Sequence, residues 1–185
     1  MNPLPNRLGS PLLFASLALV TACSLKPIPR DPMAAPAGAA TSKPADPSKV
    51  VAFSFTDLDG KEVSTASVAG RTTIVLFATS YDPFALAEAH FLADIEHKHA
   101  PRINVVLIDL ERDDNRPLVQ AFGDALNHPF PICMADNDTI AGHGPFEGMN
   151  SVPSILILDK GGHEKYRHLG LQKQAEIEDA LASVE

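Results

Sequence analysis

The sequence contains few cysteines and no excess of positive charge. Its two cysteines are Cys23 and Cys133, so no cysteine lies between residues 24 and 132. It has 15 lysines and arginines against 23 aspartates and glutamates, and it shows no basic patch and no internal repeat. An acidic surface repels nucleic acid, so we expect no nucleic-acid partner.

The sequence also lacks an apolar run long enough to cross a membrane, because a spanning helix needs about 20 apolar residues. The apolar stretch PLLFASLALV covers only residues 11–20, with Arg7 before it and small residues after it. This pattern predicts a secretory signal peptide. The stretch leads into VTAC at residues 20–23, which resembles a bacterial lipobox, in which the cysteine is lipidated and becomes the new N-terminus. The alternative is an ordinary signal peptide followed by a chance cysteine.

The lipobox interpretation predicts where the protein resides. Ser24, rather than an aspartate, follows Cys23, and this pattern favours the outer membrane. We therefore predict a lipid-anchored protein of the bacterial cell envelope that faces the periplasm and contacts the membrane through the lipid on Cys23. Removing residues 1–23 takes away only Arg7 among the charged residues, so the rest carries 14 basic and 23 acidic residues, a net charge of −9.

A proline- and alanine-rich segment follows the signal. Residues 24–49 contain six prolines and six alanines without apolar periodicity, so they cannot build a core. They predict an extended, semi-rigid tether with a rise of about 3 Å per residue. The predicted organisation is a lipoprotein signal peptide at 1–23, a tether at 24–49 and one globular domain at 50–185, which is long enough to bury a core.

Predicted strands and helices alternate along the domain. It opens with a hairpin, in which VAFSF (51–55) and KEVST (61–65) flank the turn DLDG. The later predicted strands are 72–79, 103–110, 130–135, 154–159 and 163–170, and the predicted helices are 83–99, 117–126 and 172–184. This order predicts an α/β fold with a mainly parallel sheet covered on both faces, to which the last hairpin adds antiparallel strands.

The helix predicted at 83–99 begins with a proline, which is well tolerated in a first helical turn. Asp82 precedes this proline and is expected to cap the helix. We expect the buried face of the helix to consist of residues at helical spacing, namely Phe84, Ala87, Phe91 and Ile95.

Two blocks of the domain together resemble the thioredoxin fold in its TlpA/redoxin branch. FSFTDLDGKEVSTASVAGRTTIVLFAT (53–79) resembles the opening of that family, a hairpin with an Asp-Gly-Lys turn and a central strand ending in F-x-A-T. NSVPSILILDKGGHE (150–164) resembles the segment around the family's cis-proline. The resemblance covers nearly all of residues 50–185. It implies a thioredoxin-like fold with a central mixed sheet flanked by helices and an N-terminal β-hairpin.

The catalytic motif of the family is missing from this chain. In the family A-T-W-C-P-P-C follows the central strand, whereas here Ala78-Thr79 is followed by SYDPF. Tyr81 and Phe84 therefore stand where the two cysteines would be, and Pro83 is kept. Thiol–disulfide exchange needs an attacking thiolate and a resolving thiol, and a tyrosine hydroxyl with a pKa of about 10 cannot form the mixed disulfide. The same absence excludes a peroxidatic cysteine or a two-cysteine copper site here.

The first functional hypothesis is a redox-inactive binding or scaffold module. It would hold an envelope protein or peptide at the former active-site groove through residues on two segments, Tyr81, Asp82, Pro83 and Phe84 on one and Val152 and Pro153 on the other. The resemblance implies that Pro153 is cis and that the backbone of Val152 pairs with an extended substrate. Exposed aromatic residues would suit a contact surface, whereas buried ones would indicate inward repacking.

The alternative is a thiol–disulfide oxidoreductase or antioxidant protein of the TlpA/redoxin type. It would work through Cys133 or through the thiols of a partner, because both cysteines of the motif are absent. Cys133 lies in the apolar segment FPICMAD. A lone cysteine in such a segment is most often a small buried hydrophobic residue. We assign no catalytic residue.

No cofactor and no metal are predicted. His90, Asp94 and His97 lie at positions i, i+4 and i+7 on one helix face, so a metal site there is an alternative to a solvated charged face. His143, near the expected rim of the site, is equally unspecific. The run DND at 136–138 begins like a calcium loop but lacks the required glycine and final glutamate, so we predict a turn.

Overall fold

The computed structural model describes residues 40–41, 46, 48–127 and 129–184. The predicted signal peptide, Cys23 and most of the predicted tether lie outside these residues. Within the described part of the chain, no helix combines the length and the apolar character that crossing a membrane requires.

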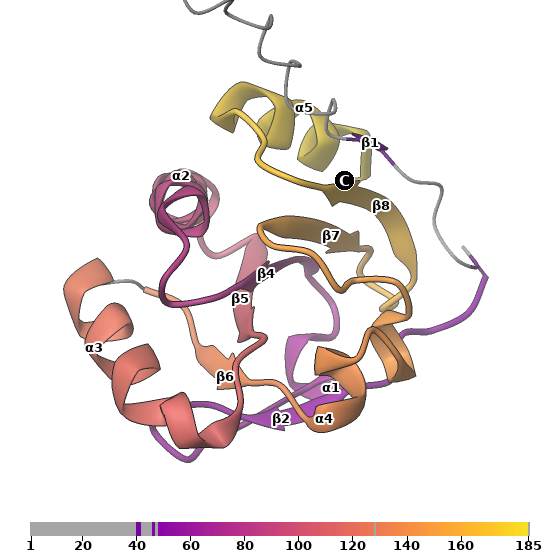
Figure 1. Ribbon diagram of the computed structural model, residues 1–185. Helices are drawn as coiled ribbons and strands as arrows, with labels where there is room; N and C mark the ends of the chain where they lie inside the picture. Colours follow the sequence, from indigo (N-terminus) through magenta and orange to yellow (C-terminus); the bar gives the residue numbers. More distant parts are fainter. Residues whose placement is uncertain (1–39, 42–45, 47, 128, 185) are drawn as a thin grey trace, which may run out of the picture. The chain divides into compact units, whose positions relative to one another are not determined.

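A six-stranded mixed sheet forms the centre of the described domain (Figure 1). Its strands lie in the order β1, β8, β7, β4, β5, β6. Their bounds are β1 Ala40–Thr41, β4 Thr72–Ala78, β5 Ile103–Asp109, β6 Ile132–Met134, β7 Ser154–Leu158 and β8 Glu164–Leu169. Strands β4, β5 and β6 are parallel, whereas β7 and β8 run antiparallel to their neighbours. The predicted central mixed sheet is confirmed, but in the described part of the chain it is not mainly parallel as predicted, because three of its five strand pairs are antiparallel.

Strand β1 comes from the segment predicted to be a tether. Ala40 pairs with Leu169 and Thr41 with His168, both antiparallel. Two residues of that segment therefore extend the sheet at its β8 edge.

The predicted hairpin is confirmed as a separate two-stranded sheet of β2 (Ser54–Thr56) and β3 (Glu62–Ser64). The side chain of Asp57 closes its turn, because Oδ1 accepts hydrogen bonds from the backbone N–H of Asp59 at 3.0 Å and of Lys61 at 2.8 Å. Gly60 supplies the left-handed conformation there, with φ +83°. The second strand is shorter than predicted because the chain then forms the short helix α1 (Thr65–Val68).

Helices and the hairpin cover opposite faces of the sheet. The long helices are α2 Pro83–His99, α3 Arg116–Leu126 and α5 Gln174–Val184; the short elements are α4 Asn137–Ile140 and the 3-10 turns η1 Asp113–Asn115 and η2 Gly144–Phe146. Strand β4 is buried along its whole length. Its residues Ile74 and Leu76 belong to the core beneath α2, α3 and α5. Val75 and Phe77 belong to the core beneath the hairpin, α1 and η2.

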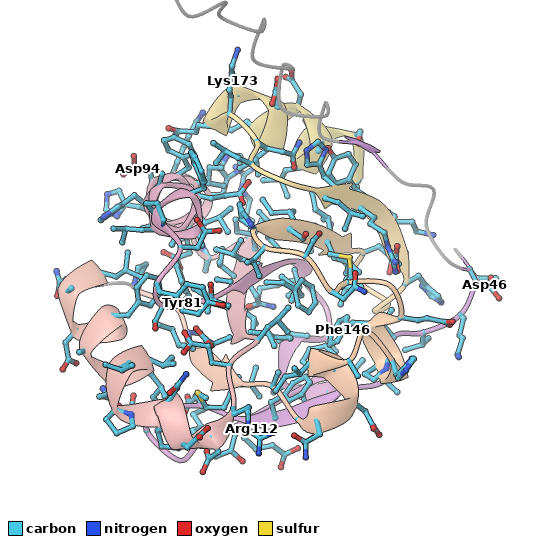
Figure 2. All side chains as sticks on the ribbon, in the orientation of Figure 1. Asp46, Tyr81, Asp94, Arg112, Phe146 and Lys173 are labelled. Atoms are coloured by element: carbon cyan, nitrogen blue, oxygen red, sulfur yellow. The ribbon has the colours of Figure 1, made fainter. Side chains whose placement is uncertain are left out.

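The second of these cores is built largely from phenylalanines. The ring of the fully buried Phe146 lies 5.1 Å from that of Phe77 and 5.3 Å from that of Phe53, measured between centroids. Figure 2 shows Phe146 among the packed side chains on this side of the domain. These contacts hold η2 and the hairpin against the central strand.

The predicted buried face of α2 is wrong in phase. The buried residues are Ala85, Glu88, Ala89, Leu92 and Ile95, so of the predicted set only Ile95 is buried. The small Ala85 and Ala89 let the helix approach the sheet closely, which turns Phe84 outward.

Candidate functional site

The site predicted from the sequence lies at the edge of the sheet where β4 and β5 end. Ala78 and Asp109, the last residues of these parallel strands, are register partners. On the other side of β4, Phe77 pairs with Ser154, so the preceding Pro153 lies beside the same end of the strand. The topology therefore brings the segments 79–84 and 152–153 to one edge, although about 70 residues separate them.

The loop from β4 to α2 ends in a helix cap. Oδ1 of Asp82 accepts a hydrogen bond from the N–H of Phe84 at 2.9 Å, which confirms the predicted cap. The N–H of Asp82 donates to the carbonyl of Thr79 at 3.3 Å, and Pro83 occupies the first helical position. The cap satisfies a backbone donor at the helix N-terminus, where the motif's thiolate would lie in the family that the sequence resembles.

Tyr81 and Phe84 are both exposed. Tyr81 is 75% exposed and Phe84 is 58% exposed, and every other Phe or Tyr in the described part of the chain is buried or half-buried. Figure 2 shows Tyr81 on the loop that leads from β4 into α2. The two aromatic residues have therefore not repacked into the core.

Pro153 follows a cis peptide bond, as the resemblance implies. Pro153 is buried and Val152 is half-buried. The carbonyl of Pro153 accepts a hydrogen bond from the N–H of Gly170 at 2.8 Å. The backbone of Val152 has no hydrogen-bond partner among the described residues.

Two acidic residues that the sequence interpretation had missed support the loop from beneath. Glu111 Oε1 accepts a hydrogen bond from the N–H of Ser80 at 2.6 Å, and its Oε2 accepts one from Asn115 Nδ2 at 2.7 Å. The N–H of Glu111 in turn donates to Asp109 Oδ1 at 2.9 Å. Asp109 ends the buried strand β5 and Glu111 follows two residues later. This acidic pair was the signal that would have revealed them, because parallel strands present their carboxyl ends at one edge.

The Asp109 side chain is fully buried. Burial, together with the nearby charge of Glu111, raises the pKa of its carboxyl to about 7, against the lowering effect of the hydrogen bond from the N–H of Glu111. Its Oδ2 and the hydroxyl of Thr79 are buried without a hydrogen-bond partner among the described residues. This carboxyl can therefore take up or release a proton near neutral pH beneath the exposed loop.

Glu88 is a second fully buried carboxyl, on α2. Its Oε1 accepts a hydrogen bond from the N–H of Gln172 at 3.0 Å, whereas Oε2 has no partner in the described part of the chain. Burial raises its pKa to about 7 against the lowering effect of that hydrogen bond, and the charge of Asp82 adds to the increase.

Cys133 lies in β6 and is fully buried. Burial, together with the negative charge of Asp57, raises the pKa of its thiol to about 12. Its neighbours in the core are apolar. A thiol in these surroundings is protonated and inaccessible, which is the opposite of a reactive cysteine.

The candidate metal residues lie on the surface. His90, Asp94 and His97 are exposed on α2, and His143 is exposed near α4. Among the described residues, no three His, Cys, Asp or Glu side chains are arranged to hold a metal ion. The run at 136–138 is not the predicted turn but the start of the short helix α4, which Asp136 Oδ1 caps by accepting from the N–H of Thr139 at 2.8 Å.

Solved structures with the same fold include several thiol–disulfide proteins. A DsbF homologue from Corynebacterium diphtheriae aligns with a TM-score of 0.66 and 18% identity over 80% of this chain and 96% of its own. A thiol:disulfide interchange protein of the thioredoxin family from Chlorobium tepidum TLS aligns with a TM-score of 0.65 and 22% identity over 77% and 99%. A secreted Mycobacterium tuberculosis disulfide oxidoreductase homologous to Escherichia coli DsbE aligns with a TM-score of 0.61 and 23% identity over 72% and 96%.

These similarities establish the fold. The domain is a thioredoxin-like α/β domain, as the resemblance of its sequence implied. No family model matches the chain, and no curated protein sequence matches it either.

Proposed function

We propose that this chain is a thioredoxin-like lipoprotein of the bacterial envelope that binds a protein partner and does not catalyse thiol–disulfide exchange. The binding edge consists of residues 81–84 together with Val152 and Pro153. The observation that carries the proposal is the exposure of Tyr81 and Phe84, which are 75% and 58% exposed where the related motif has its two cysteines.

The chemistry of this edge suits an extended peptide. Aromatic side chains are enriched among the residues that dominate protein interfaces. The half-buried Val152 offers an N–H and a carbonyl that no described residue uses. An extended segment of a partner can pair with this backbone while its side chains contact Tyr81 and Phe84.

Among the described residues there is no reactive thiol, which supports redox inactivity. Tyr81 and Phe84 replace both thiols, and the one described cysteine, Cys133, is buried with a pKa of about 12. A competing function as a thiol–disulfide oxidoreductase is favoured by the activity named for the structural neighbours. It would need Cys133 or a thiol of a partner as the nucleophile.

The proposed location follows from the N-terminal sequence. The motif VTAC at residues 20–23 supports lipidation of Cys23, and Ser24 supports sorting to the outer membrane. The tether would then hold the domain away from the membrane on the periplasmic side. One structural neighbour is a secreted protein, which agrees with this assignment.

Insulin reduction tests the redox part of the proposal. The full chain and its Cys133→Ser variant are assayed beside an active thioredoxin with the same reductant. We expect no turnover above the reductant alone from either protein. Turnover that is lost in Cys133→Ser would overturn the proposal and identify Cys133 as the nucleophile.

Site-specific photo-cross-linking tests the binding part. A photoreactive phenylalanine analogue replaces Phe84 in the full chain, and a matched variant carries it at His97, which is exposed on the same helix. We expect one discrete cross-linked protein from position 84 in intact cells, none from position 97, and a lower yield when Tyr81→Ala is added. Equal cross-linking from both positions would contradict the proposed edge.

A further inference from the structure

The loop that presents Tyr81 is held by a buried carboxyl group that does not belong to the binding edge itself. Glu111 Oε1 accepts a hydrogen bond at 2.6 Å from the N–H of Ser80, the residue before Tyr81. A charged acceptor makes a stronger hydrogen bond than a neutral one. By contrast, the bond from the N–H of Asp82 to the carbonyl of Thr79 lies within the loop. Glu111 therefore connects this loop to a segment that is distant in the sequence.

The side chain of Glu111 is oriented at its other oxygen as well. Its Oε2 accepts a hydrogen bond from Asn115 Nδ2, in η1, at 2.7 Å. Both oxygens of the carboxylate thus have a donor, one from the loop before α2 and one from η1. The side chain bridges these two segments in a fixed orientation.

Asp109 places a second carboxyl group beside Glu111. It is fully buried, its Oδ1 accepts one hydrogen bond from the N–H of Glu111, and its Oδ2 has no partner among the described residues. While Asp109 carries its proton, Glu111 bears the only negative charge of the pair. Once Asp109 ionises, two negative charges share this buried site. That state is unfavourable, because like charges repel strongly there and a buried charge needs several hydrogen bonds.

Glu111 is the charged residue that acts on Asp109, since its charge raises the pKa of the Asp109 carboxyl. Neighbouring strand ends bring neutral groups to this place. The hydroxyl of Thr79 follows β4, and the backbone N–H of Ala135 follows β6 and donates to the carbonyl of Asp109 at 2.9 Å. The repulsion on ionisation therefore falls on the contact between Asp109 and Glu111.

Other charged side chains of the adjoining elements interact with other groups. At the start of α2, the charge of Asp82 raises the pKa of Glu88. The ion pairs of η1 lie on the surface and are Asp113 with Arg116 and Asp114 with Arg112. Of the two buried carboxyl groups, Glu111 is 5% exposed and Asp109 is 0% exposed, so we expect repulsion to move Glu111 outward and away from Ser80.

We propose that Glu111 positions Tyr81 for partner binding and that ionisation of Asp109 releases this hold, so that the binding edge is ordered in acid and loosened in alkali. The inference rests on the proposed function and adds a means of regulating the same site. An ordered Tyr81 favours binding because less side-chain and loop freedom is lost when the partner docks.

The amide signal of Ser80 reports the hold without any partner. The measurement is a pH series of ¹H–¹⁵N spectra of the labelled full chain, in which a hydrogen bond to a carboxylate moves an amide proton to low field. We expect the Ser80 signal to move upfield between pH 5 and pH 8 with its midpoint near pH 7, where Asp109 ionises. In Asp109→Asn, which cannot ionise, the signal should stay at low field.

Glu88→Gln is the matched control for this titration. Glu88 is also a fully buried carboxyl with a pKa of about 7, and a glutamine there still accepts a hydrogen bond from the N–H of Gln172. The control should leave the movement of the Ser80 signal unchanged. A Ser80 signal that does not titrate, or that titrates equally in Asp109→Asn, would overturn the proposal.

Cross-linking at two pH values tests the effect on binding. With the photoreactive analogue at position 84 of the full chain, in a cell lysate buffered at pH 6 or pH 8, we expect a yield about fivefold lower at pH 8, the effect of one lost hydrogen bond. In Asp109→Asn the two yields should be equal. Equal yields in the chain without this substitution would overturn the regulation of binding.

Two substitutions of Glu111 separate the hold from its regulation. Glu111→Gln keeps an acceptor for the N–H of Ser80 but removes the charge, so we expect a high yield at both pH values. Glu111→Ala removes the acceptor and should give a low yield at both. If Glu111→Ala cross-links as well as the chain without it, Glu111 does not position the edge. The absence of any cross-link at both pH values would contradict the proposed function, whereas the Ser80 titration decides the hold of Glu111 independently.

Discussion

At the scale of single residues, Asp109 and Glu88 are two carboxyl groups buried in the domain with pKa values of about 7. A carboxyl whose pKa is higher in the folded chain binds its proton more tightly there than in the unfolded chain. Its contribution to stability is therefore complete below the ordinary pKa near 4 and is lost as the pH rises through about 7. We infer that the domain is less stable at pH 8 than at pH 5.

Replacing Asp109 tests this pH dependence. A pKa raised from 3.8 to about 7 predicts that about 2–3 kcal/mol of unfolding free energy is lost between pH 5 and pH 8 because of this group. Asp109→Asn cannot ionise, so the decline measured by urea unfolding should become smaller by that amount. The exposed Asp138→Asn serves as the control. A decline equally steep in Asp109→Asn would contradict the assignment.

The thiol of Cys133 gives a second test at this scale. With a pKa of about 12, only about one thiol in ten thousand is ionised at pH 8, and the side chain is fully buried. In a chain carrying Cys23→Ser, reaction with a disulfide reagent should be more than about 100-fold slower in the native than in the urea-unfolded protein. Rapid labelling of the native chain would revive the oxidoreductase hypothesis.

At the scale of elements, the beginning of α2 determines how the binding edge is presented. Asp82 caps the N-terminus of α2, and Pro83 is the first residue of the helix. Ala85 and Ala89 then pack against the sheet, so the residue before them, Phe84, faces solvent. The exposure of Phe84 is therefore a consequence of the rotation of the helix about its axis.

Removing the cap tests this account. Asp82→Ala loses the hydrogen bond to the N–H of Phe84 and should lower the unfolding free energy by about 1 kcal/mol. Asp82→Ser keeps an acceptor and should recover most of this loss. Asp94→Ala, at an exposed position of the same helix, should change stability by less than about 0.5 kcal/mol. Identical effects of Asp82→Ala and Asp94→Ala would show that the cap contributes nothing.

At the scale of the whole described domain, stability comes from two cores on opposite faces of one sheet. Phe146 joins the second core to η2 through its contacts with Phe53 and Phe77. The proposed binding edge lies where the parallel strands β4 and β5 end.

Two phenylalanine substitutions distinguish a residue that stabilises the domain from one that we expect to contact the partner. Phe146→Ala removes a fully buried ring and should cost about 3–5 kcal/mol in urea unfolding. Phe84→Ala removes a ring that is 58% exposed and should change stability by less than about 1 kcal/mol while it weakens partner binding. A large loss of stability in Phe84→Ala would mean that this ring serves packing and not recognition.

Much of the fold was predictable because its signals are local. The continuous β-branched run at 72–79 predicted the buried strand β4, and Pro83 after Asp82 predicted the start of α2. The hairpin followed from its turn residues. The candidate edge at 81–84 was found because a resemblance in sequence aligned it with a known motif, and the missing cysteines are visible in the sequence itself.

The sequence by itself determined the α/β class, the order of the elements and the absence of a thiol pair, because each depends on residue types and short-range periodicity. Only the tertiary structure decided which face of α2 is buried and that Glu111 supports Ser80, which is 31 residues away. The same holds for the contact of Glu88 with Gln172, 84 residues away. These features depend on which distant segments become neighbours, and that is settled by the packing of the whole chain.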